Sequence, residues 1–124
     1  MLFECLSVKF KNVNKKVAWI FLIIGGLFEV GFTTCLNAAK HSTGTVATLW
    51  YAGFAVSLAL SMIFLMIATK SLPMGTAYAV WTGIGAVGTA LIGILIFKEP
   101  ADFWRVFFIF TLIASIVGLK YVAP

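Results

Sequence analysis

The sequence predicts an all-α membrane protein with four transmembrane helices. Hydrophobic residues make up 62% of the 124-residue chain and charged residues only 10%, whereas soluble domains are about 45–50% apolar and about 25% charged. The mean hydropathy is +1.09. The apolar residues fall into four runs, each near the length of about 20 residues that a spanning helix needs. A water-soluble domain of this size cannot bury so much apolar surface, so lipid is the expected solvent.

The elements follow in order along the chain. Residues 1–16, MLFECLSVKFKNVNKK, predict a basic cytoplasmic tail, because they lack the apolar core and cleavage site of a signal peptide. An over-extended start, with translation beginning at Val17, is the alternative. Residues 17–122 predict a single transmembrane domain with helices over 17–39, 46–69, 72–97 and 103–122. The connections are very short, and Pro100 separates the last two helices.

The basic residues indicate how the chain sits in the membrane. The tail, the second connection and the C-terminal end lie on one side and carry more Lys and Arg than the first and third connections. With the tail, the N-terminus is therefore expected in the cytoplasm. Without the tail, the numbers of Lys and Arg on the two sides are nearly equal and favour neither orientation. Such a chain is expected to insert both ways.

Glu29 is the one charged residue that falls clearly inside a predicted span, within IIGGLFEVGFTT. A charge at that depth costs at least about 2.5–3.5 kcal/mol, and such residues usually mark a transport path. Glu29 therefore predicts a site that binds a proton or a cation. A protonated carboxyl that only joins two helices is the structural alternative.

Helical spacing predicts what surrounds Glu29. Residues three and four apart share one face of a helix, which places Gly26 and Thr33 beside Glu29, with Phe32 adjacent. On the third helix the same spacing aligns an aromatic pair with a hydroxyl, and the second helix has a lone hydroxyl among Leu and Met. A carboxylate, hydroxyls and aromatic faces together suit a small organic cation. The expected lining residues are Gly26, Phe32, Thr33, Ser61, Tyr78 and Trp81.

The segment GIGAVG, 83–88, matches the dinucleotide-binding pattern but has no strand before it, so no nucleotide site is expected. Glycines in a membrane helix instead permit close packing and bending. Gly83, Gly85 and Gly88 therefore predict a hinge in the third helix. In the fourth helix, Ala114 and Gly118 have the small-xxx-small spacing that favours helix contact, which predicts a dimer.

Taken together, these residues resemble the small multidrug resistance transporters, and most closely their guanidinium-exporter subtype. The resemblance covers about residues 17–122 and is strongest in KSLPMGTAYAVWTGIGAVGTALIGILIFKEP, GGLFEV and IVGLK. It implies a multi-pass protein of the bacterial inner membrane that works as an antiparallel, dual-topology dimer. Such a dimer exchanges protons for a cation on the first-helix carboxylate, here Glu29, and its fourth helices form much of the dimer contact.

The resemblance leaves two alternatives open. The guanidinium exporters usually have Trp three residues after the Glu, where this chain has Phe32. The substrate is therefore expected to be guanidinium or a small substituted guanidinium, with quaternary ammonium or other lipophilic cations as the alternative. The partner is expected to be a second copy or a paralogous chain in a heterodimer. We expect no enzymatic activity, cofactor, metal or nucleic acid.

Overall fold

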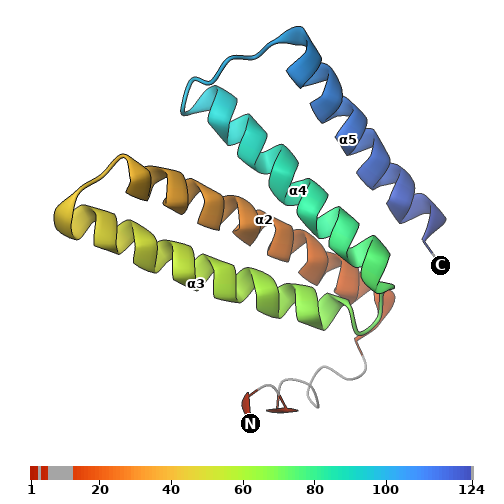
Figure 1. The fold of residues 1–124 in the computed structure, drawn as a ribbon. Helices are drawn as coiled ribbons and strands as arrows, with labels where there is room; N and C mark the ends of the chain where they lie inside the picture. The colour runs from red at the N-terminus through yellow and green to blue at the C-terminus, as the bar shows by residue number, and fades with distance from the viewer. Residues whose placement is uncertain (3, 6–12, 124) are drawn as a thin grey trace.

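The computed structural model describes residues 1–2, 4–5 and 13–123 and contains four long helices (Figure 1). They are α2 (Lys15–Lys40), α3 (Gly44–Ala68), α4 (Met74–Leu95) and α5 (Phe103–Val122). Each helix is long and apolar enough to cross a membrane. The expected all-α fold with four spanning helices is therefore confirmed for the described part of the chain. Residues 3 and 6–12 of the expected tail lie outside the described residues.

The helix ends follow local chemistry. α2 begins two residues before the expected start, because the Asn14 side chain accepts a hydrogen bond of 2.9 Å from the Val17 N–H and caps the helix. α4 is shorter than the expected 72–97. It begins after Pro73 and ends at Leu95, beyond which the Glu99 N–H donates to the Gly93 carbonyl at 3.0 Å and turns the chain back.

The four helices do not form a symmetrical bundle. α2 lies between α3 and α4, and α5 packs along the outer side of α4 (Figure 1). A buried cluster joins the start of α2, the end of α3 and the start of α4, and it includes Leu22, Leu65 and Val80. None of the described residues of α5 is buried. α2 is thus the central helix of the chain, and α5 is the peripheral one.

The glycines of α4 let neighbouring side chains approach its backbone. A Cβ atom at Gly83 would lie 2.6 Å from Ile116 Cδ1 on α5. At Gly85 the Cβ would overlap the carboxyl group of Glu29, and at Gly88 it would overlap Val30. The sequence predicted these three glycines as a hinge. The structure gives each of them a packing role, because each one leaves room for a side chain of α2 or α5.

Candidate functional site

Glu29 lies against α4 at the edge of a cavity. The cavity has a volume of about 370 Å³, and α2, α4 and the start of α5 contribute to its wall. Glu29 Oε2 is buried and, among the described residues, has no hydrogen-bond partner. A buried polar group without a partner is costly, so such a group in a cavity calls for an explanation in terms of function. The lining residues are Glu29, Thr33, Thr82, Gly85, Ala86, Thr89, Ala90, Glu99 and Arg105.

Hydroxyl groups line the cavity beside the carboxylate. The hydroxyls of Thr33 on α2 and Thr89 on α4 are 2.7 Å apart and form a hydrogen bond between the two helices. Thr33 also donates to the Val30 carbonyl at 2.9 Å. Thr82 and Thr89 lie two turns apart on α4, and both face the cavity. The structure therefore brings Thr33 together with Glu29, as the helical spacing predicted.

Ser61 and Trp81 belong to a separate, buried network. The Trp81 indole N–H donates to Ser61 Oγ at 2.9 Å, and the Ser61 hydroxyl donates to the Gly25 carbonyl at 2.7 Å. Gly25 lies one turn before Glu29 on α2. This chain of hydrogen bonds ties α4 and α3 to the segment of α2 that carries the carboxylate. Within one chain, Ser61 and Trp81 fix the position of that segment and do not line the 370 Å³ cavity.

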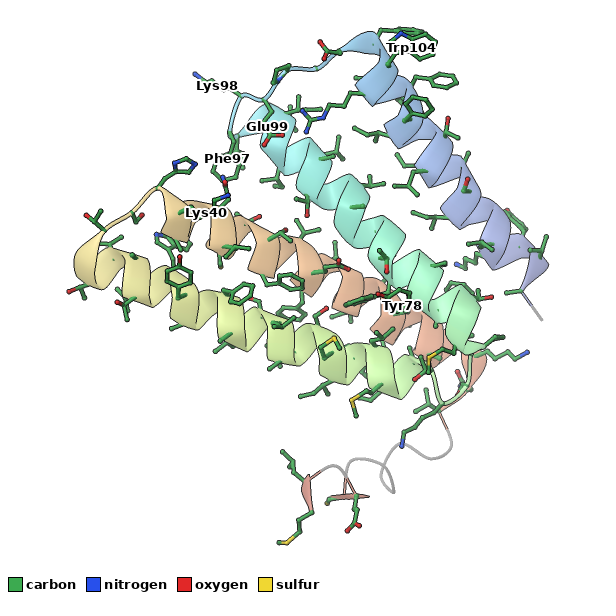
Figure 2. All side chains as sticks on the ribbon, in the orientation of Figure 1. Lys40, Tyr78, Phe97, Lys98, Glu99 and Trp104 are labelled. Carbon is green, nitrogen blue, oxygen red and sulfur yellow. The ribbon has the colours of Figure 1, made fainter. Side chains whose placement is uncertain are left out.

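The other expected lining residues also lie apart from the Glu29 cavity. Tyr78 is 55% exposed, and its ring lies 5.5 Å from that of Trp81 (Figure 2). Phe32 packs edge-on against Phe54 of α3 at 5.7 Å. Gly26 lies beneath Ile84, since a Cβ there would come within 2.7 Å of Ile84 Cγ2. Of the predicted lining residues, the single chain thus places Thr33 in the cavity of Glu29.

The connection between α4 and α5 and the start of α5 add two charged side chains to the lining of the cavity. Arg105 forms an ion pair with Glu99, with Nη2 and Oε2 2.5 Å apart, and both side chains line the same cavity as Glu29. A smaller cavity of about 120 Å³ continues past Thr33 and Thr89 to Asn37 and Glu99. Sequence reasoning missed Thr89, Glu99 and Arg105 as members of this site. The i, i+7 spacing of Thr82 and Thr89 is the signal that indicates the first of them.

No cluster of three or more His, Cys, Asp or Glu that is able to hold a metal ion lies among the residues that the structure describes. The cavity instead offers one carboxylate with a buried oxygen, several hydroxyls and a second carboxylate already paired with a guanidinium group. Chemically, this set suits a small cation with hydrogen-bond donors.

Comparison with known proteins identifies the family. Residues 17–113 match the family described as Small Multidrug Resistance protein. The chain belongs to the small multidrug resistance family. Together with the four apolar helices, this membership makes it a multi-pass protein of the bacterial inner membrane and a transporter.

Relatives within the small multidrug resistance family carry more specific names. The chain is 46% identical over 105 residues to a probable guanidinium efflux system subunit GdnD of Bacillus licheniformis, covering 85% of this chain and 98% of that protein. It is 45% identical over 107 residues to a guanidinium exporter of Yersinia pseudotuberculosis, covering 84% and 97%. It is 41% identical over 107 residues to the guanidinium exporter of Escherichia coli, covering 84% and 96%. The predicted resemblance to the guanidinium-exporter subtype is confirmed.

Proposed function

We propose that this chain is a proton-coupled antiporter that exports guanidinium or small substituted guanidinium cations across the inner membrane. The observation that carries the proposal is the buried, unpartnered Oε2 of Glu29 at a cavity inside the membrane-spanning helices. The relatives named guanidinium exporters support the choice of cation. In this proposal a proton and the cation compete for the same carboxylate, and this competition couples the two fluxes.

The lining of the cavity favours guanidinium over a quaternary ammonium ion. Guanidinium is planar, and its edge carries N–H donors that match a carboxylate and hydroxyl oxygens. Glu29, Thr33 and Thr89 supply such acceptors in one cavity. A quaternary ammonium ion has no N–H group and binds through charge and aromatic faces. The ring of Phe32 packs edge-on against Phe54, and the ring of Trp81 is buried between the helices.

The transport cycle that we propose needs two copies of the site. Two chains in an antiparallel dimer bring two Glu29 carboxylates to a shared cation, and the pair of chains re-exposes the site to the other side by bending α4 at Gly83, Gly85 and Gly88. In the dimer, Tyr78, with its exposed ring, reaches the substrate, while Ser61 and Trp81 hold the segment that carries Glu29. Gly26 and Phe32 lie apart from the cavity within one chain. We propose that they shape the wall of the site that the two chains form together.

The partner in this dimer is a second copy or a paralogous chain. The Bacillus licheniformis relative is named a subunit of an efflux system, which favours keeping a heterodimer as the second candidate. We propose that Ala114 and Gly118 of α5 form part of the contact in either case.

The proposal is tested by electrical currents from proteoliposomes that contain the purified chain alone. Perfusion with guanidinium is expected to give currents that depend on a proton gradient, and tetrapropylammonium is expected to give none. Glu29→Gln should abolish the guanidinium currents while the dimer still assembles, because the amide neither releases a proton nor attracts a cation. Glu4→Gln removes a carboxylate at an exposed position and serves as the matched control.

Three outcomes would redirect the proposal. Currents with tetrapropylammonium would move the chain to the multidrug side of the family. Currents that appear only after reconstitution with a paralogous chain would establish the heterodimer. Proton-coupled transport that persists in Glu29→Gln would remove Glu29 from the mechanism.

A further inference from the structure

The connection between α4 and α5 holds Glu99 in a defined place at the end of α4. Lys98 has φ 54°, a left-handed conformation that is uncommon for a residue with a side chain. This conformation directs Glu99 back toward α4, where its N–H donates to the Gly93 carbonyl at 3.0 Å. The Glu99 carboxylate rests on Gly93, since a Cβ there would lie 2.5 Å from Oε2. Figure 2 shows Glu99 at this end of α4, with Lys98 directed away from the helices.

The partner of Glu99 is a guanidinium group. Arg105 Nη2 lies 2.5 Å from Glu99 Oε2, and Arg105 Nη1 donates to the Pro100 carbonyl at 2.9 Å. The pair is partly exposed, with side-chain exposures of 34% for Arg105 and 47% for Glu99. Exposed pairs are weak and exchange readily. A planar cation that donates N–H groups is therefore held loosely by a carboxylate that lines the cavity of Glu29.

We infer that Glu99 is an outer binding site for guanidinium-type cations and that Arg105 is a built-in competitor for it. This inference rests on the proposed function. A free guanidinium ion carries the same donor groups as the Arg105 side chain, so whatever Glu99 offers to Arg105 it also offers to the substrate. The incoming cation displaces Arg105 from Glu99, and the same cavity then gives it access to the Glu29 carboxylate.

A competitor and a purely structural ion pair predict different effects of mutation. If the pair only held the connection together, then removing either partner would lower thermal stability and leave the affinity for the substrate unchanged. A competitor behaves asymmetrically. Removing Arg105 frees Glu99 and strengthens cation binding, whereas removing Glu99 deletes the outer site and leaves an unpaired cationic side chain at the cavity.

The experiment compares guanidinium-driven currents from proteoliposomes of the full-length wild-type chain, Arg105→Gln, Glu99→Gln and the double variant. Arg105→Gln is expected to lower the apparent KM for guanidinium by about two- to fivefold, the range that an exposed ion pair corresponds to. Glu99→Gln is expected to raise it. In the double variant the gain from Arg105→Gln should vanish, because it depends on Glu99. Lys98→Gln removes a neighbouring positive charge and is expected to leave KM unchanged.

Arg105→Lys is the second variant, for use in case Arg105→Gln does not fold. An ammonium group pairs with a carboxylate without the planar fork of Arg. The KM of Arg105→Lys for guanidinium should therefore fall between the values for the wild type and Arg105→Gln. An unchanged KM in the folded Arg105 variants, or an equal fall in Lys98→Gln, would overturn the inference. Absence of guanidinium currents from the wild-type chain, both alone and after reconstitution with a paralogous chain, would instead refute the proposed function itself, so the two failures are distinguishable.

Discussion

The Glu29 carboxyl fits against α4 because residue 85 has no side chain. A Cβ atom at Gly85 would occupy the same space as the carboxyl group. Because residue 85 has no methyl group, the carboxylate can approach the α4 backbone. Its Oε2 is buried there without a partner among the described residues. Gly85 thus has a direct effect on the group that we propose to bind protons and substrate, in addition to any role in bending the helix.

Gly85→Ala is expected to displace the Glu29 carboxyl and weaken guanidinium transport. Overpacking of this kind costs about 1–3 kcal/mol, which corresponds to roughly a 5- to 150-fold rise in the apparent KM if it falls on the bound state. Gly75→Ala is the matched control on the same helix, because no described atom beyond its chain neighbours and the backbone of its own helix lies within 4 Å of its Cβ position. The currents are measured as a function of guanidinium concentration. Equal KM values for the two variants would contradict the close fit.

At the scale of helices, hydropathy predicted the fold well. Four apolar runs gave four helices, since a lipid environment leaves a spanning segment few other ways to satisfy its backbone. The end of α4 was predicted less well, because Ile96 and Phe97 continue the apolar run after the helix has ended at Leu95. Hydropathy predicts which residues can lie in lipid, but it does not predict where a helix ends. The end of α4 depends on backbone hydrogen bonds in the turn at Lys98.

The site was predictable only along single helices. Glu29 and Thr33 lie one turn apart on α2, so spacing alone placed them together. Thr89, Glu99 and Arg105 join them through packing between helices and through a turn, and neither is encoded in the period of one helix. Trp81 and Thr82 show the same limit, because adjacent residues on a helix point in directions about 100° apart. Trp81 bonds to Ser61, and Thr82 faces the cavity.

The hydrogen bonds of Ser61 to Trp81 and Gly25 join three helices, and they give a prediction about stability. Ser61→Ala removes the acceptor of the Trp81 N–H and the donor to the Gly25 carbonyl in one step. Hydrogen bonds between membrane helices contribute about 0.6–2 kcal/mol, so the midpoint of thermal unfolding in detergent should fall. Ser115→Ala is the control, because the Ser115 hydroxyl donates to the Thr111 carbonyl of its own helix at 2.9 Å. An equal midpoint for both variants would show that the hydrogen bonds of Ser61 contribute nothing.

At the scale of the whole molecule, α5 is the helix whose apolar side chains are least covered by the rest of the chain. Large apolar side chains such as Phe103, Phe108 and Phe110 are exposed along it, and none of its described residues is buried. α5 packs mainly against α4 (Figure 1). Its Lys120 ammonium also lies 5.6 Å from the ring of Trp19 on α2. Lipid satisfies an apolar surface, but it does not explain the small residues Ala114 and Gly118, which favour a second helix at close range.

The proposed dimer contact is tested at Gly118. No described atom beyond its chain neighbours and the backbone of its own helix lies within 4 Å of its Cβ position, so Gly118→Leu fits within one chain. In a dimer that packs α5 against α5, the added side chain holds the two helices apart. Light scattering in mild detergent should therefore give the mass of a monomer for the variant and of a dimer for the wild type.

The control for this prediction is Gly75, which is equally open within the chain but lies on α4. Gly75→Leu should therefore remain dimeric, and a Gly118→Leu protein that remains dimeric as well would place the contact elsewhere. Because the proposed mechanism needs two Glu29 carboxylates, loss of the dimer in Gly118→Leu should abolish guanidinium currents although every residue of the single-chain site is intact.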